Sequence, residues 1–334
     1  MRLAIDAMGG DYAPEQIVKG TLEAALDSSQ VTFQLYGDEK QISQILGDQK
    51  PENIEIHHTE DVITGDDDPV RAVRRKREAS LVVAAHAVKN GEADGLLSCG
   101  NTGALVASGI LIVGRMTGID RPALMATLPA IGSTRSSIQY MDAGANSDAK
   151  PLNVYQHAVL GDFYAREILG IDHPTLALLN NGTEENKGSK LLRESYAMIS
   201  EDESLNFIGN MEARDILSGV ADVIVADGFT GNAVLKSMEG TASSIMKLLK
   251  ESVNDGGVMP KVGAYLLKDT LKEMMKSLNS EEIGGALIFG LKAPVMKAHG
   301  SSKAKAVNNA LKQLEGIVAS DMFSRIEEKF SITQ

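Results

Sequence analysis

The sequence predicts an α/β fold in which helices cover both faces of a mainly parallel β-sheet. One observation is that short apolar runs alternate with segments of helical periodicity along most of the 334 residues. Another is that several apolar runs lead directly into loops rich in glycine and asparagine. A third is Val223–Ala226, a continuously apolar run typical of a strand that is buried on both faces.

The predicted strands are short apolar runs. Most of them are separated by enough residues to form a helix. They are Leu3–Ile5, Val31–Tyr36, Ile54–His57, Gly95–Ser98, Ile138–Met141, Leu176–Leu179, Phe207–Ile208, Val223–Ala226 and Ala286–Phe289. One predicted helix begins near Pro14, whose missing N–H suits a first turn, and a final helix has apolar positions from Val307 to Ile326. We find no low-complexity linker and no repeat of fixed period, so we predict a single domain over residues 1–334.

The stretch Val223–Gly240 (VIVADGFTGNAVLKSMEG) is predicted to contain a strand, a glycine-rich turn and a helix. Such a turn brings together unpaired backbone N–H groups and the positive end of a helix dipole, which favour an anion. The turn from Asp227 to Asn232 is therefore a candidate phosphate site, with Gly228 and Gly231 as supporting residues.

Composition limits the possible functions. The net charge of −12 and the lack of tryptophan argue against nucleic-acid binding, because phosphate backbones attract basic surfaces and bases stack on aromatic rings. One cysteine permits no internal disulfide, which favours the reducing cytoplasm. The N-terminal residues make no signal-peptide core, and no apolar run is long enough to span a bilayer. We therefore expect a soluble cytoplasmic protein.

Four predicted loops after strands are rich in glycine and asparagine: CGNTG, NNGTEENKG, IGN and DGFTGN. A single such loop is often only a tight turn. Several of them at the carboxyl edge of a parallel sheet, where ligands bind in such folds, favour a shared polar pocket over plain turns. Neither GxGxxG nor GxxxxGKS/T occurs, so these loops suit a small anion better than a diphosphate.

Metal and nucleophile chemistry have little support in the sequence. The six histidines lack ligand-like spacing and no GxSxG motif occurs, so we predict no metal site and no serine nucleophile. Cys99 follows an apolar strand, where a small buried side chain is the simpler interpretation. The segment KAHGSS offers hydrogen-bond donors from Lys297, His299, Ser301 and Ser302, although Ser301 or Ser302 would alternatively serve only as a helix cap.

Segments spread along the chain together resemble one family. In order they are AIDAMGGDYAP, PVRAVRRKR, CGNTGAL, GIDRPAL, GANSDAKP, NNGTEENKG, IGNMEARD, DGFTGN and LKAPVMKAHGSS. The chain resembles the bacterial acyl-ACP:phosphate acyltransferases, which make acyl phosphate at the start of phospholipid synthesis. The resemblance extends from Leu3 to about Ser302. Its one mild departure is Cys99, where a smaller residue such as alanine is expected.

The resemblance implies a doubly wound α/β/α sandwich like that of isopropylmalate dehydrogenase and phosphotransacetylase. It also implies a homodimer that needs no cofactor and associates peripherally with the inner face of the cell membrane. The expected partners are acyl carrier protein with a long-chain acyl group, inorganic phosphate, and a downstream glycerol-phosphate acyltransferase.

The residues suit the implied reaction, in which phosphate attacks a thioester carbonyl. Phosphate is already nucleophilic at neutral pH, so the protein must position the reactants and stabilise the tetrahedral oxyanion. By resemblance the catalytic residues are Lys187, which would supply positive charge, and Asn232, which would donate a hydrogen bond from the first turn of its helix. The alternatives are a solvated loop lysine and a helix N-cap.

Further candidates surround these two residues. Those expected to hold phosphate are Asn101, Thr102, Gly103, His299 and Ser301. Asp6 and Asp227 follow or end strands, where they would orient the donors or have only a structural role.

Two basic stretches are expected to meet partners. Arg71, Arg74 and Arg75 share a helical face on which an acidic carrier protein would dock, unless they pair with the acidic residues 66–68 or stay solvated. Residues 237–280 contain a lysine-rich amphipathic segment, which is predicted to lie at a dimer interface, the membrane or an acyl channel, or to pack within its own subunit. Its membrane or acyl candidates are Val262, Leu266 and Met274.

Three other functions remain possible at this point. A phosphotransacetylase for short acyl-CoA would share the fold and the phosphate loops but would need no long apolar stretch. A nicotinamide-dependent decarboxylating dehydrogenase would need metal-binding carboxylates and a nucleotide site, which the sequence lacks. A non-catalytic lipid-surface protein would leave the glycine and asparagine loops without a purpose.

Overall fold

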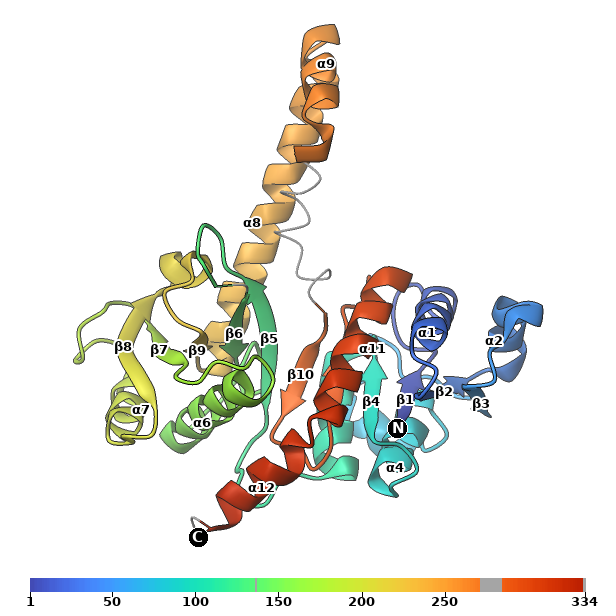
Figure 1. Cartoon of the computed structure of the whole chain (residues 1–334), viewed down its shortest axis with the longest axis horizontal. Coiled ribbons are helices and arrows are strands. Elements are labelled where there is room, and N and C mark those ends of the chain that lie inside the picture. The colour runs from blue at the N-terminus through green and yellow to red at the C-terminus, as the bar shows by residue number, and fades with distance from the viewer. Residues whose placement is uncertain (136, 271–283, 333–334) are drawn as a thin grey trace.

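The computed structural model describes residues 1–135, 137–270 and 284–332. Its centre is a sheet of eleven strands in the order β3-β2-β1-β4-β11-β10-β5-β6-β9-β7-β8 (Figure 1). The strands are β1 (Arg2–Asp6), β2 (Thr32–Gly37), β3 (Ile54–His58), β4 (Gly95–Ser98), β5 (Ala123–Pro129), β6 (Ser137–Met141), β7 (Thr175–Asn180), β8 (Asn206–Glu212), β9 (Val223–Val225), β10 (Ala286–Phe289) and β11 (Val295–Lys297).

The sheet is mainly parallel, as predicted, but its middle is antiparallel. β5 pairs antiparallel with both β6 and β10, and β10 pairs antiparallel with β11. The other described neighbours are parallel. The three antiparallel pairings make β1–β4 and β11 run opposite to β6–β9. The predicted single domain over residues 1–334 stays a prediction.

This reversal corrects the expectation that the glycine and asparagine loops share one carboxyl edge. The CGNTG loop follows β4, whereas NNGTEENKG and DGFTGN follow β7 and β9, whose carboxyl ends lie at the opposite edge. The IGN segment is not a loop, because it lies inside β8, where Gly209 has a φ of 95° and the register with β7 shifts. Alternating strands and helices do not reveal strand direction, which depends on pairing between distant segments.

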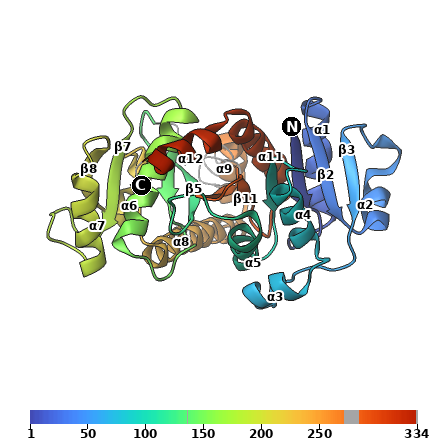
Figure 2. The same ribbon diagram turned by 90° about the horizontal axis from the view of Figure 1, so that it is seen from below.

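Helices cover both faces of the sheet, which confirms the predicted α/β/α sandwich. One face carries α1 (Glu15–Asp27), α2 (Glu39–Leu46), α6 (Pro151–Glu167), α7 (Lys190–Ser200), α11 (Ala304–Ala319) and α12 (Met322–Ile332). The other carries α3 (Pro69–Arg75), α4 (Ser80–Lys89), α5 (Thr102–Ser108), the π-helical segment η2 (Gly109–Val113) and the start of α8 (Gly228–Asp255). Figure 2 shows α11 and α12 on one side of the sheet and α3, α5 and α8 on the other.

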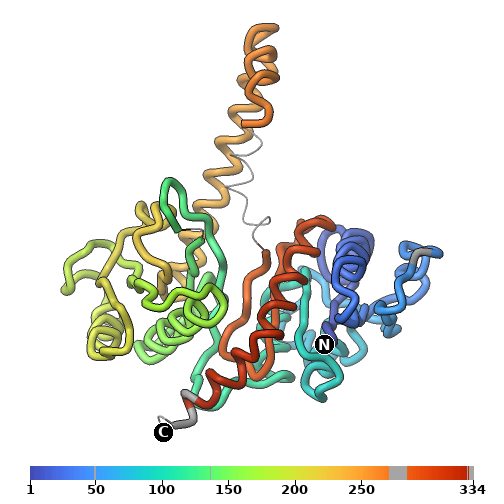
Figure 3. The backbone as a smooth tube through the Cα atoms, in the orientation of Figure 1, coloured from blue at the N-terminus to red at the C-terminus, as the bar shows by residue number. Residues whose placement is uncertain are grey.

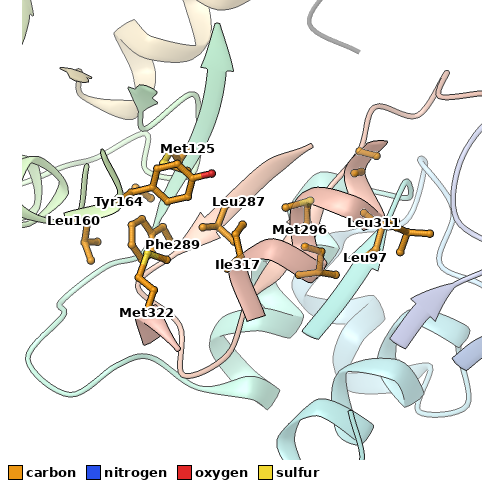
Figure 4. Packing of buried hydrophobic residues seen from close by; sticks show 14 of the residues in the cluster. Leu97, Met125, Leu160, Tyr164, Leu287, Phe289, Met296, Leu311, Ile317 and Met322 are labelled. Atoms are coloured by element: carbon orange, nitrogen blue, oxygen red, sulfur yellow. The ribbon is translucent and has the colours of Figure 1, made fainter. Parts of the chain in front are cut away.

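The core beneath α11 and α12 holds the antiparallel middle of the sheet in place. Figure 4 shows Leu311 and Ile317 of α11 in one apolar cluster with Met296 and Leu287 of the sheet. The rings of Tyr164 and Phe289 meet edge to face with centroids 6.2 Å apart, an arrangement that aromatic pairs favour.

The predicted final helix is two helices. α11 ends at Ala319 and α12 begins at Met322, and between them Asp321 has the left-handed φ of 52°. Leu314 and Ile326, on either side of the break, are buried in the same core. Apolar spacing therefore continues across the break, and periodicity alone could not reveal it.

α8 projects from the body and carries α9 (Val258–Leu266) at its far end (Figures 1 and 3). We call the outer half of α8 together with α9 the arm. No residue of α9 is buried, and the exposed fraction of Leu266 is 77%. The predicted residues Val262 and Leu266 lie on α9, whereas Met274 lies outside the described residues, as does the part of 237–280 beyond 270. Across the described ranges, none of the helices combines the length and apolarity needed to cross a membrane.

Candidate active site

A cleft of about 1060 Å³ lies on the sheet face that carries α5 and α8. Its floor is β5, which contributes Leu124, Ala126 and Leu128. Its apolar wall comes from α5 and η2, where Val106 and Ile110 face it. These three residues alternate along the strand because only every second side chain points to this face, and Thr127 between them also contributes to the lining.

The polar part of the cleft comes from loops of both halves of the sheet. The loops after β1, β4, β6 and β11 all reach it, and the second and third turns of α8 complete it. Residues from opposite carboxyl edges can share one cleft because the cleft runs along the face of β5, between the two halves. The predicted shared pocket is therefore only partly correct. CGNTG and Asn232 of DGFTGN line this cleft, whereas NNGTEENKG lines a second cleft and IGN lines neither.

Four of the five predicted phosphate-binding residues line this cleft, namely Asn101, Thr102, Gly103 and His299. Ser301 is not among the lining residues, and its hydroxyl lies 2.8 Å from Nδ1 of His299. The Asn101 side chain is already engaged, since its Oδ1 accepts from the Ala104 N–H at 3.0 Å and its amide donates to the Thr64 carbonyl at 3.1 Å.

Asn232 lines the cleft from the second turn of α8. The predictions that placed it in the first turn, or as an N-cap, are wrong, because the cap is Asp227, whose Oδ1 accepts from the Thr230 N–H at 2.9 Å. A neighbour that the sequence analysis missed is Gly144, where a Cβ would lie 3.0 Å from the Asn232 side chain. Asp142 fixes this loop by accepting from the Ala145 N–H at 2.8 Å.

The two glycines of the DGFTGN turn permit this close approach. A Cβ on Gly228 would lie 2.4 Å from the Asn146 carbonyl oxygen, and one on Gly231 would lie 2.1 Å from that of Asp142. Both distances are impossible for a real side chain, so the start of α8 can rest on the loop after β6 only with glycine at these positions. In the structure these two glycines therefore permit close packing at the start of the helix that carries Asn232.

Asp6 is buried at the end of β1, below the cleft. Its oxygens accept from the hydroxyls of Ser80 at 2.6 Å and Ser98 at 2.7 Å. Burial raises the pKa of Asp6, and the hydrogen bonds from both serines oppose that rise. Ser98 also accepts from the Gly100 N–H at 3.0 Å, so Asp6 orients the loop after β4 indirectly, through Ser98.

Lys187 lies apart from this cleft. Its neighbours Asn180 and Gly188 line a second cleft of about 530 Å³ together with Asp227 and Thr230. Lys187 is half exposed, and its Nζ lies 3.7 Å from Glu184 Oε1, a surface pair of small energetic value. Both Lys187 and Asn232 follow strands with the same direction, but the structure does not bring them into one cleft.

Lys297 also lines the cleft, although the sequence analysis named it only as a hydrogen-bond donor and not as a phosphate-binding residue. It ends β11, and its exposed fraction is 9%. Its Nζ donates to the Cys99 carbonyl at 3.1 Å and to the Ala298 carbonyl. Burial lowers the pKa of Lys297 and raises that of the Cys99 thiol to about 12, so Cys99 fits the small buried role predicted for it.

The exposed basic patch on α3, formed by Arg71, Arg74 and Arg75, borders the cleft. α3 packs on the start of α5, where a Cβ on Gly103 would lie 2.7 Å from Pro69 Cγ. Within the described ranges the three arginines form no ion pair, and Lys76 instead pairs with Asp67 at 2.9 Å. This leaves the arginines solvated instead of bound to the acidic residues 66–68.

Nothing in the described ranges brings three or more His, Cys, Asp or Glu side chains into a group suited to a metal ion. The predicted lack of a metal and of a cofactor stays a prediction.

Solved structures with a similar fold span nearly the whole chain. A phosphotransacetylase from Streptococcus pyogenes matches with a TM-score of 0.61 and 16% identity, and covers 97% of this chain and 94% of that one. A branched-chain phosphotransacylase from Enterococcus faecalis matches with a TM-score of 0.57 and 15% identity, over 95% and 99%. At these identities the likeness shows the fold alone.

Sequence relatives are much closer. Proteins named phosphate acyltransferase from the Streptococcus pneumoniae strains Hungary19A-6 and CGSP14 are each 53% identical over 330 residues, which is 99% of both chains. A family model described as fatty acid synthesis protein matches residues 1–325. The chain therefore belongs to this fatty acid synthesis protein family.

Proposed function

We propose that this protein is an acyltransferase that moves a long-chain acyl group from acyl carrier protein to inorganic phosphate. The observation that carries the proposal is a single cleft that combines an apolar wall and floor with polar strand-end loops and a buried lysine. An acyl phosphate has one apolar and one anionic part, and this cleft offers surroundings for both. The full-length relatives named phosphate acyltransferase support the same reaction.

In the reaction, a phosphate oxygen attacks the thioester carbonyl and the carbon–sulfur bond breaks. The products are acyl phosphate and a thiolate that takes up a proton. Asn232 is the proposed donor to the oxyanion, and of the four phosphate candidates that line the cleft we assign phosphate binding to Thr102, Gly103 and His299. We retain Asn101 and Ser301 as residues that shape these loops, and Lys187 as a catalytic candidate whose test is given below.

The reaction is tested by incubating the protein with palmitoyl-carrier protein and phosphate, and trapping acyl phosphate with hydroxylamine. We expect hydroxamate to form only when phosphate is present. Turnover of acetyl-CoA without turnover of palmitoyl-carrier would instead identify a short-chain phosphotransacetylase. Absence of phosphate-dependent product from all donors would reject the proposed function.

Carrier protein is proposed to dock on the basic patch of α3. The patch is exposed, lacks internal ion pairs in the described part of the chain, and adjoins the cleft at Pro69 and Val70. A carrier docked there would place its acyl-pantetheine arm at the opening of the cleft. Charge attraction would mainly accelerate the encounter.

The double variant Arg71→Glu/Arg74→Glu is therefore expected to raise the KM for palmitoyl-carrier about tenfold, with little change for palmitoyl-pantetheine. Steady-state kinetics with both donors measure the difference. Lys89→Glu, at the end of α4, is the control. Equal effects on both donors would show that the patch does not recognise the carrier.

The arm is proposed to mediate dimer contact and peripheral membrane association on the cytoplasmic side. α8 lines the cleft at Asn232 and Leu235 and continues outward to α9, so it links the site with the arm. Met259, Tyr265 and Leu266 are each at least three-quarters exposed, and such an apolar surface favours contact with another surface. Lys261 and Lys268 beside them would attract anionic lipid. A membrane position would also bring the product close to a glycerol-phosphate acyltransferase.

Leu266→Glu is expected to reduce binding to anionic vesicles severalfold while melting temperature stays unchanged, because Leu266 is 77% exposed. Vesicle flotation and circular dichroism measure the two quantities. Leu26→Glu, a similarly exposed leucine on α1, is the control. Undiminished flotation of folded Leu266→Glu protein would exclude α9 as the membrane contact.

A further inference from the structure

Lys297 is a buried lysine that the fold does not neutralise. No carboxylate forms an ion pair with it in the described ranges, and its two observed acceptors are neutral carbonyls, those of Cys99 and Ala298. Burying an ammonium group without an anionic partner is costly, and such groups occur preferentially at functional sites. The cost would be offset if an anion occupied the cleft beside it.

The geometry leaves this ammonium group available to a ligand. Lys297 faces the cleft, since Val295 two residues before it belongs to the core on that same sheet face. An ammonium group has three N–H donors, of which the two carbonyls take two. The Lys236 side chain also lines the cleft, but it is ion-paired with Glu239 at 2.8 Å.

We propose that Lys297 binds the inorganic phosphate that accepts the acyl group, with its third N–H donated to a phosphate oxygen. This inference rests on the proposed function and adds the cation of the phosphate site. Thr102, the first residue of α5, and His299, which follows β11, would complete the site. The Lys187 side chain is not among the cleft-lining residues, so it does not supply this charge in the described arrangement.

Several charged groups surround Lys297 and set its pH response. Burial lowers the pKa of Lys297 overall. Cys99, Asp6 and Asp11 favour the charged lysine, whereas Lys236 on α8 disfavours it. As pH rises through this lowered pKa, the ammonium charge is lost and phosphate affinity falls. An arginine at position 297 would keep its charge at all these pH values. In Lys297→Arg, phosphate affinity would therefore begin to fall only at higher pH than in wild type.

The test compares wild type, Lys297→Met, Lys297→Arg and the control Lys303→Met, an exposed lysine outside the cleft lining. Lys297→Met is expected to raise the KM for phosphate about 10- to 100-fold, the value of one charge-assisted hydrogen bond, with the KM for palmitoyl-carrier unchanged. Lys303→Met should behave as wild type. An unchanged phosphate KM in folded Lys297→Met protein overturns the proposal.

A second readout needs no acyl donor. Phosphate should raise the melting temperature of wild type and Lys303→Met above that in chloride of equal ionic strength, and should not do so for Lys297→Met. An equal shift in Lys297→Met would also overturn the proposal. If this variant does not fold, Lys297→Arg provides the test. A shift to higher pH of the point at which phosphate affinity falls supports phosphate binding by Lys297, and an unchanged point contradicts it. Wild type without any phosphate-dependent hydroxamate would reject the proposed function itself.

Discussion

Asn232→Ala is expected to lower kcat for acyl phosphate formation by about 10²- to 10³-fold, the usual loss when one oxyanion donor is removed. Asn232 is exposed to the cleft and rests against Gly144, and it is not the helix cap. Its removal should therefore cost little stability while it deletes a donor from the cleft. Hydroxamate formation at saturating substrates and thermal melting measure the two effects.

The control for this variant is Asn254→Ala, which changes an exposed asparagine of the same helix in the arm. It should retain wild-type kcat. A kcat for Asn232→Ala within twofold of wild type would remove Asn232 from the mechanism.

A double-variant cycle decides how Lys187 contributes. If Lys187 and Asn232 stabilise the same transition state, Lys187→Met and Asn232→Ala should be strongly non-additive in kcat. The described arrangement places Lys187 beside the second cleft, so additive effects would assign it a separate task.

Ile110→Trp is expected to shift acyl-chain preference toward shorter chains, with kcat/KM for palmitoyl-carrier lowered about 10- to 100-fold relative to octanoyl-carrier. Ile110 lies on the π-helical segment η2, and it faces the cleft as part of its apolar wall. A larger ring there would occupy space that the far end of a long chain needs. Kinetics with carriers of graded chain length measure the shift.

Leu111→Trp provides the matched control, because Leu111 is the next residue and is also exposed but does not line the cleft. It should leave the chain-length profile unchanged. A profile that is the same for Ile110→Trp and wild type would place the acyl chain elsewhere.

Local patterns in the sequence were sufficient to predict most elements and many lining residues. Gly95–Ser98 is a strand with the predicted bounds, and Val223–Val225 is a buried strand followed by α8. This helix begins at Gly228, so residues 228–232 of the predicted turn are helical. These features depend on apolar periodicity and turn residues, which act over a few neighbours. Asn101 and His299 were likewise predicted from their loops, and both line the cleft.

The burial of Lys297 is a feature that the sequence did not reveal. In LKAPVMKAHGSS it looks like an ordinary lysine near a strand end, and nothing local indicates burial. It is buried because β11 lies between β4 and β10, which brings its Nζ to the carbonyl of a residue 198 positions away. Contacts over such separations depend on strand order, and apolar periodicity carries no information about strand order.

The sequence by itself determined the α/β class, the succession of strand and helix around DGFTGN and, through its motifs, the family. Only the tertiary structure decided the reversed direction of the two halves, the placement of Asn232 and Lys187 beside different clefts, and the burial of Lys297. The physical reason is that turns and periodicity are short-range preferences. Strand order, direction and burial are fixed jointly by packing of the whole chain.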